Sequence, residues 1–309
     1  MRRVATSVVL VLAGAVAAAA QPVFRSGVDL VRFGVTVLDD EGELVSGLTA
    51  DDFRLVEEGQ EQRIAYFSRG LRLDSDRIPL RLGVLFDVSG SMTVDASFTK
   101  TAAIRFLRGL DFAADMTLVE FDTQVRVSRF TRADFPRLVE RLRSQRAEGM
   151  TALYDALGVY LDGAFAQDGR KLLLLYTDGA DTRSRLRYGE LRDLLRASDV
   201  TVYAIGFQAQ RRNMRQMRER QRLRQIAALT GGRAYFPISR DDLDEIYGEI
   251  REELEARYSI GYVSTDRTTD GAWRRVTVSL RGDRPELDDA RVRTREGYFA
   301  PYIEESAPR

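Results

Sequence analysis

Residues 80–91 read LRLGVLFDVSGS, a compact apolar run followed at once by a loop of oxygen-bearing side chains. The run resembles a strand that is buried on both faces, as in a parallel sheet. Similar apolar runs occur at 116–121, 171–177 and 200–206. Helical patterns accompany them at about 98–110, 152–165, 188–198, 214–229 and 241–257. This alternation predicts an α/β fold over residues 78–257, with a doubly wound, mostly parallel sheet and helices on both faces.

One strand of this sheet should run against the others. Residues 125–130 follow the run at 116–121 after a link of only Asp122, Thr123 and Gln124. A parallel crossover needs a dozen or more residues. We therefore expect residues 125–130 to form an antiparallel edge strand.

Both flanks of the α/β segment have the period-two pattern of antiparallel strands. The N-terminal region, residues 21–75, alternates from Val28 to Tyr66, and the C-terminal region, residues 258–309, alternates from Tyr258 onward. A flank of about 40 residues is short for an independent sandwich. We therefore expect the two flanks to pair into one smaller β-sandwich into which the α/β domain is inserted. Two separate β units would produce the same pattern.

The first twenty residues have the order of a secretory signal peptide. Met1-Arg2-Arg3 precede an apolar run and then a stretch of alanines that ends at Ala20, after which we place the cleavage site. The apolar run falls short of the ~20 residues needed to span a bilayer. We expect export by the general secretory route, to the periplasm or out of the cell, with no transmembrane anchor after cleavage.

The composition narrows the chemistry that is available. The chain of 309 residues has no cysteine and no histidine, and it carries 47 basic side chains against 47 acidic ones. Disulfides, zinc fingers and nucleophiles activated by histidine are therefore excluded. A hard cation with oxygen ligands, magnesium or calcium, remains possible. The balanced charge favours neither a nucleic acid nor an anionic membrane as partner.

The candidate site consists of oxygen-bearing residues that follow two of the apolar runs. Asp87, Ser89 and Ser91 alternate after the first run, and Asp178 directly follows another. Because the carboxyl ends of parallel strands meet at one edge of a sheet, these side chains should lie close together. Thr151 stands at the start of a predicted helix, where its hydroxyl either caps the helix or turns toward a ligand.

Asp-x-Ser-x-Ser, Gly-x-Thr and Thr-Asp-Gly, in this order on alternating strands and helices, resemble the metal-ion-dependent adhesion site of the von Willebrand factor A domain family. The resemblance covers about residues 78–257. It implies that Ser89, Ser91 and Thr151 reach the ion directly, and that Asp87 and Asp178 hold it directly or through water. It also implies Mg as the cofactor, with Ca or Mn possible, and a protein partner that offers an Asp or Glu carboxylate to the ion. On the residues alone, the alternative is that these side chains only cap helices and end strands.

The flanks carry a second, narrower resemblance, to exported bacterial proteins known as von Willebrand factor A-related and frequent in Acidobacteria. This resemblance implies export and the overall architecture, but it does not imply a specific function. The patterns that carry it are Asp39-x-x-Gly42, Val45-x-Gly47-Leu48-Thr49-x-x-Asp52-Phe53, Glu57-x-Gly59 and Arg295-x-Gly297-Tyr298.

Three functions are compatible with this sequence. The first is an exported, non-enzymatic, metal-dependent protein-binding module. The second is a metal-assisted hydrolase that uses the ion to activate water, for which only Asp155 and Asp181 are candidate bases. The third is a structural envelope protein with a vestigial site. The stretch 211–224, with seven arginines and one acid, is either a solvated helix face or a docking surface for an acidic partner.

Overall fold

The computed structural model describes most of the chain outside its two ends. The described residues are 30–70, 79–93, 96–110, 113–207, 214–282, 284 and 287–302. The expected signal peptide, residues 1–20, lies outside them, as does the beginning of the arginine-rich stretch. Within these residues, no helix is both long enough and apolar enough to cross a membrane.

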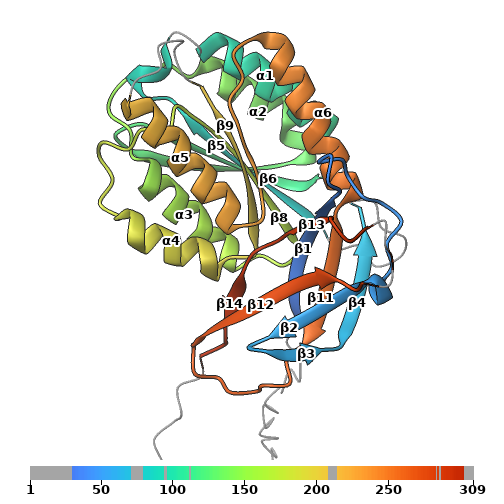
Figure 1. The fold of residues 1–309 in the computed structure, drawn as a ribbon. Helices are drawn as coiled ribbons and strands as arrows, with labels where there is room; N and C mark the ends of the chain where they lie inside the picture. Colours follow the sequence, from blue (N-terminus) through green and yellow to red (C-terminus); the bar gives the residue numbers. More distant parts are fainter. Residues whose placement is uncertain are drawn as a thin grey trace, which may run out of the picture.

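Six strands form the central sheet (Figure 1). Neighbouring strands pair in parallel except β6 and β7, which pair antiparallel. The four predicted parallel strands and the antiparallel edge strand are therefore confirmed, whereas the sequence pattern did not reveal the two-residue β10. In sheet order the strands are β10 (Ala234–Tyr235), β9 (Val200–Gly206), β8 (Arg170–Thr177), β5 (Leu80–Asp87), β6 (Ala113–Phe121) and β7 (Val125–Thr131).

Six α-helices of the described residues cover both faces of this sheet, as predicted (Figure 1). One face carries α1 (Ala96–Gly109), α2 (Phe135–Ser144) and α6 (Arg240–Ala256); the other carries α3 (Leu153–Phe165), α4 (Tyr188–Ala197) and α5 (Met214–Leu229). Helix α2 was not expected from the sequence pattern. Its signals are Pro136 in the first turn and Leu138 and Leu142, buried one turn apart.

The strands of the two flanks form two small antiparallel sheets. Each sheet combines both ends of the chain: Phe33 lies opposite Ile260 in one, and Leu55 lies opposite Val278 in the other. Apolar side chains of both sheets form one shared core. The flanks therefore make a single smaller sandwich, as predicted. In the first sheet the strand order is β13 (Arg291–Arg293), β1 (Leu30–Leu38), β11 (Tyr258–Val263) and β4 (Ile64–Arg69). In the second sheet the order is β14 (Gly297–Phe299), β12 (Trp273–Leu280), β2 (Phe53–Glu57) and β3 (Gln60–Gln62).

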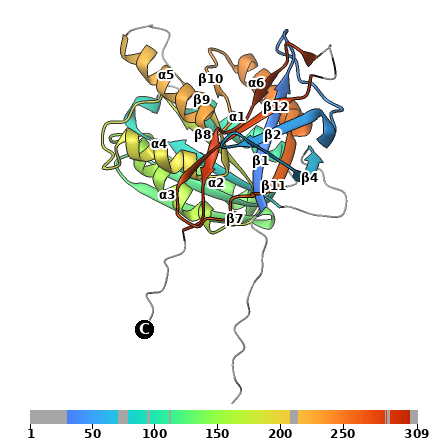
Figure 2. The same ribbon diagram turned by 60° about the horizontal axis from the view of Figure 1, so that its bottom comes forward.

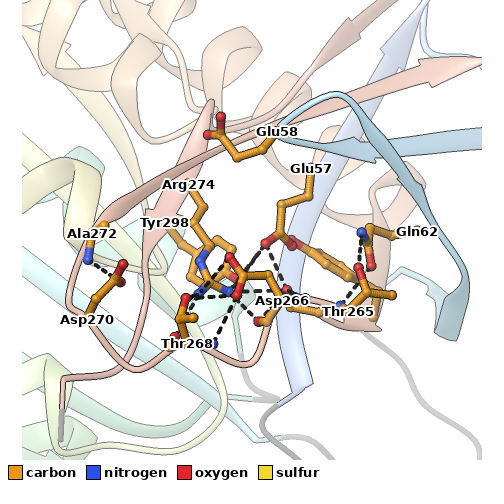
Figure 3. A network of polar contacts seen from close by, with 12 residues as sticks. Glu57, Glu58, Gln62, Thr265, Asp266, Thr268, Asp270, Ala272, Arg274 and Tyr298 are labelled. Atoms are coloured by element: carbon orange, nitrogen blue, oxygen red, sulfur yellow. Dashed lines mark hydrogen bonds and ion pairs between the residues drawn. The ribbon is translucent and has the colours of Figure 1, made fainter.

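A buried ion pair lies within this sandwich (Figure 3). Nη1 of Arg274 on β12 lies 3.4 Å from Oε1 of Glu57 on β2, and the two side chains are 5% and 3% exposed. Tyr262 of β11 donates a hydrogen bond of 2.6 Å to the same carboxylate. Arg274 also donates to the carbonyl oxygens of Asp266 and Thr268, both at 2.6 Å. Since β11 and β12 belong to different sheets, this polar network joins the two sheets.

A second buried carboxylate, Glu253 near the end of α6, connects the sandwich to the α/β domain. It accepts a hydrogen bond from Thr36 of β1 at 3.2 Å and another from Tyr203 of β9. Arg293 of β13 forms an ion pair with it. Because these partners come from the sandwich and from the central sheet, Glu253 fixes one unit against the other.

Candidate metal-binding site

Asp87 forms the floor of the candidate site. It is the last residue of β5 and is only 1% exposed. Its Oδ1 accepts a hydrogen bond of 2.9 Å from the backbone N–H of Ser89, and its Oδ2 accepts one of 2.6 Å from Oγ1 of Thr177. Burial raises the pKa of this carboxyl to about 7, with a contribution from the charge of Asp178, although the hydrogen bonds from Ser89 and Thr177 lower it. A carboxylate in this setting lacks positive charge, which a bound cation would supply.

The serine loop, residues 88–91, places two hydroxyls side by side next to Asp87. Oγ of Ser89 and Oγ of Ser91 lie 3.1 Å apart. Ser89 is buried and Ser91 is exposed, so the pair extends from the floor of the site to solvent. The loop continues into a 3-10 helix, η2 (Gly90–Thr93).

The threonine loop, residues 148–152, lies directly against the serine loop. The backbone N–H of Gly90 donates to the carbonyl oxygen of Gly149 at 3.1 Å. Gly149 has a φ of +81°, and a Cβ at this position would lie 2.8 Å from Oγ1 of Thr123. Only glycine tolerates both conditions without strain, so Gly149 sets the path of the loop.

Thr151 does not cap the helix that follows it. Helix α3 begins at Leu153, its N-cap residue is Ala152, and no side chain accepts a hydrogen bond there. The Thr151 hydroxyl forms no hydrogen bond with any described residue, while its backbone N–H donates to Oγ1 of Thr182 at 3.0 Å. The capping alternative for Thr151 is therefore wrong. This buried side chain, 3% exposed, keeps a free oxygen at the site.

The aspartate loop, residues 178–183, is the third loop that carries a predicted ligand. Asp178 is half-buried and accepts a hydrogen bond of 3.0 Å from the backbone N–H of Ala180. The carbonyl oxygen of Thr151 accepts hydrogen bonds from the backbone N–H groups of Thr182 and Arg183, at 2.9 and 3.0 Å. The structure therefore brings the three loops that carry the predicted ligands together at the carboxyl edge of the sheet.

The oxygen atoms gathered here suit a hard cation. They come from the five residues that the sequence singled out, Asp87, Ser89, Ser91, Thr151 and Asp178. Magnesium prefers oxygen ligands and usually keeps several waters. No group of three or more acidic side chains in the described part of the chain could hold a metal. The hydroxyl groups of Ser89, Ser91 and Thr151 are therefore candidate ligands beside the two carboxylates.

The two carboxylates considered as general bases stabilise the surrounding backbone. Asp155 accepts backbone hydrogen bonds from Arg185, at 3.1 and 3.0 Å, and from Leu186, at 2.8 Å. Asp181 accepts one from the hydroxyl of Ser184 at 2.6 Å and one from a backbone N–H of α3 at 3.3 Å. Burial raises the pKa of Asp181. Both side chains therefore hold the segment after β8 against the start of α3.

A groove of about 740 Å³ lies elsewhere in the molecule. Lys171 and Asp199, at the amino ends of β8 and β9, form one side of it, and Arg274 and Tyr298 of the sandwich contribute to the other. None of the five predicted ligand residues lines it. The groove and the candidate metal site are therefore at opposite ends of the central strands.

Comparisons with known proteins agree with this architecture. The family model described as von Willebrand factor type A domain matches residues 82–249. No curated protein matches the chain by sequence. The pilus adhesin SpaC from Lactobacillus rhamnosus GG, in its open conformation, is similar with a TM-score of 0.50 and 12% identity, over 81% of this chain and 48% of SpaC. The chain thus spans about half the length of SpaC, and the similarity indicates a shared fold.

Two further solved structures are similar at lower TM-scores. The von Willebrand factor type A protein from Catenulispora acidiphila has a TM-score of 0.47 and 14% identity, over 91% of this chain and 76% of that one. Proximal thread matrix protein 1 from the mussel byssus has a TM-score of 0.45 and 20% identity, over 56% of this chain and 47% of that one. In that structure, zinc occupies the metal-ion-dependent adhesion site (MIDAS) motif.

Proposed function

Because the chain belongs to the von Willebrand factor type A domain family, we propose that it is an exported, non-enzymatic protein-binding module that acts through a bound divalent cation. The proposed cation is Mg²⁺, with Ca²⁺ or Mn²⁺ as possible replacements. Its proposed ligands are Asp87, Ser89, Ser91, Thr151 and Asp178. The observation that carries the proposal is the buried Asp87 carboxylate, whose neighbours in the site are hydroxyl groups and the carboxylate of Asp178.

A divalent cation held by these residues would supply the positive charge that attracts an Asp or Glu carboxylate of the partner protein. Asp87 is held in place for this task by its hydrogen bonds from Thr177 and from the backbone of Ser89. The exposed Ser91 stands on the solvent side, where a partner approaches. The backbone N–H groups of Thr182 and Arg183 fix Thr151 through its carbonyl oxygen, which leaves the side-chain hydroxyl available to a ligand.

The two alternatives have less support. A hydrolase needs a base near the ion, and the candidates Asp155 and Asp181 accept hydrogen bonds from the surrounding loop. A structural protein with a vestigial site does not require all five ligand positions to remain intact. It also does not account for the Thr151 hydroxyl, which makes no hydrogen bond within the described residues.

We further propose that residues 1–20 are a signal peptide for the general secretory route, and that the mature protein begins at Gln21 and works in the periplasm or outside the cell. The order of charged, apolar and small residues supports this location. Membership of the exported bacterial group frequent in Acidobacteria belongs to the same proposal. N-terminal sequencing of protein purified from separated cell fractions tests the cleavage after Ala20.

Thermal unfolding with and without Mg²⁺ tests the metal site. The wild type should gain stability with Mg²⁺ and lose the gain with EDTA. Asp87→Asn, which keeps the shape of the side chain, should show no gain. Asp244→Asn is the matched control, since Asp244 lies in an exposed ion pair with Arg105, and it should respond like the wild type. An equal Mg²⁺ response in Asp87→Asn would overturn the assignment.

The binding role is tested by crosslinking in the cell envelope. Partner capture should require Mg²⁺ and should disappear in Asp87→Asn while circular dichroism shows a folded protein. Capture that persists in EDTA and in this variant contradicts the metal role. Metal-dependent turnover of a phosphoester or peptide by the wild type, lost in Asp178→Ala, favours the hydrolase instead.

A further inference from the structure

Methionines in the described part of the chain divide into a buried and an exposed group. Met92 and Met116 are 2% and 5% exposed, whereas Met150, Met214 and Met217 are 57%, 68% and 60% exposed. Met150 lies in the threonine loop, and Met214 and Met217 lie in the first turn of α5, the helix that packs against the aspartate loop. Exposed apolar side chains on elements that border a candidate binding site can contribute to a contact surface, and methionine adapts to partners of varied shape.

The start of α5 lies beside the aspartate loop. A Cβ at Gly179 would lie 3.3 Å from Cβ of Glu219. Arg215 forms an ion pair of 2.8 Å with Glu219. The pKa of Arg215 is raised by this hydrogen bond and, to a smaller degree, by the charge of Asp178. Figure 2 shows the first turns of α5 projecting from the body of the molecule, and Met214, Met217 and Arg218 in these turns are exposed.

Arginines accompany the methionines around the site. Met214 lies three and four positions before Met217 and Arg218, and residues at this spacing share one face of a helix. Arg218 is exposed and forms no ion pair with a described residue. Arg183, also exposed, lies next to the ligand loops because its backbone N–H donates to the carbonyl of Thr151 at 3.0 Å. We call the set Met150, Arg183, Met214, Arg215, Met217 and Arg218 the rim.

Other arginines of α5 are already engaged within the protein. The guanidinium of Arg222 lies 3.8 Å from the centre of the Tyr188 ring, and that of Arg220 lies 4.2 Å from the centre of the Phe236 ring. These cation–π contacts hold α5 against its neighbours. Within its described residues, 214–224, the arginine-rich stretch therefore has two parts, one that packs intramolecularly and one, at the start of the helix, that is exposed to solvent.

We propose that the rim binds an acidic segment of the partner protein that also carries bulky aliphatic side chains. This inference rests on the proposed function, because it describes the partner of the same site. One carboxylate of the segment reaches the ion, further carboxylates pair with Arg183 and Arg218, and the aliphatic side chains pack on the three methionines, while Arg215 stays paired with Glu219. The opposite charges bring the segment to the site and set its orientation.

The test uses a fluorescein-labelled peptide of alternating glutamate and leucine, with fluorescence anisotropy in Mg²⁺ as the readout. The double variant Arg183→Glu with Arg218→Glu should bind the peptide more weakly by about tenfold or more. Met214→Ser with Met217→Ser should also weaken binding. The double variant Arg63→Glu with Arg291→Glu, which reverses two exposed arginines of the sandwich, should bind like the wild type. Added salt should reduce the wild-type affinity.

The Mg²⁺-induced rise in Tm separates this inference from the proposed function. Rim variants should keep that rise, because they retain all five ligand residues. Equal peptide affinity in rim variants and wild type overturns the rim proposal, as does the absence of peptide binding to the wild type or equal binding of a lysine–leucine peptide. If the peptide binds Asp87→Asn as tightly as the wild type while rim variants lose it, the rim stands and the metal-dependent function fails.

Discussion

Oγ1 of Thr177 donates a hydrogen bond of 2.6 Å to Oδ2 of Asp87. The two residues are neighbours because β5 and β8 pair in parallel, with Phe86 opposite Tyr176 at their ends. The bond fixes one oxygen of the central carboxylate from the adjacent strand. Mutation of groups that orient a metal ligand in this way typically lowers metal affinity by about 10–100-fold.

Thr177→Val should therefore weaken Mg²⁺ binding by about tenfold, because valine keeps the shape of threonine but cannot donate to Asp87. The N–H of Gly179, which donates to the same hydroxyl at 3.1 Å, also loses its acceptor. Isothermal titration calorimetry measures the affinity. Thr201→Val, the same change on the neighbouring β9, is the control and should bind Mg²⁺ like the wild type. Equal affinity in the two variants would show that Thr177 does not position Asp87.

The contribution of Asp87 to the stability of the metal-free protein should fall as pH rises from about 4 to about 7. Burial raises the pKa of Asp87 from 3.8 to about 7 in the folded state. Between these values the folded carboxyl still holds a proton that the unfolded chain has released. Its contribution is therefore complete below the unfolded pKa and is lost as pH rises through the folded pKa.

Mg²⁺ competes with that proton, so the affinity for Mg²⁺ should increase over the same pH window. Thermal unfolding in EDTA and in Mg²⁺ across this range measures both trends. Asp87→Asn carries no titrating group at this position and serves as the control. A metal-free wild type whose pH profile matches that of Asp87→Asn would contradict the assignment of the trend to Asp87.

Gly149→Ala should destabilise the protein by about 1–2 kcal/mol and weaken Mg²⁺ binding, because it strains a left-handed backbone position and pushes the threonine loop from Thr123. Gly189→Ala is a matched change near the start of α4, where an added Cβ meets nothing within 4 Å. Alanine favours the helix there, so stability should stay equal or rise by up to about 1 kcal/mol. Urea unfolding measures the free energy of unfolding, and isothermal titration calorimetry measures the Mg²⁺ affinity. Unchanged Mg²⁺ affinity in Gly149→Ala would show that the conformation of the threonine loop does not affect ion binding.

Glu57→Gln should destabilise the sandwich by about 2–3 kcal/mol, because it leaves the buried Arg274 without its closest buried carboxylate. The Mg²⁺-induced rise in Tm should remain, since the network lies far from the ligand loops. Glu61→Gln is the control: its ion pairs with Arg54 and Arg281 are about half exposed, so the cost should stay below about 1 kcal/mol. Similar costs for both variants, measured by urea unfolding, would show that the buried pair contributes no more to stability than the exposed pairs of Glu61.

Much of the α/β domain could be predicted because its signals are local. The strand that ends at Asp87 is apolar at nearly every position, since helices cover both faces of the sheet. The three-residue link before Val125 excludes a parallel crossover, and the structure has the antiparallel pair. By contrast, α2 is a short helix with only Leu138, Val139 and Leu142 buried, so its pattern is weak.

The sequence by itself determined the order of strands and helices and the oxygen-bearing residues at the strand ends, because periodicity and spacing are local properties of the chain. Only the tertiary structure decided which strands of the two flanks pair, since every such strand has a similar alternation and its partner lies about two hundred residues away, as for Phe33 and Ile260. The same holds for the hydroxyl of Thr151, which makes no hydrogen bond with a described residue, and for the start of α5 beside Asp178. Those relationships depend on packing between distant segments, and no local pattern records them.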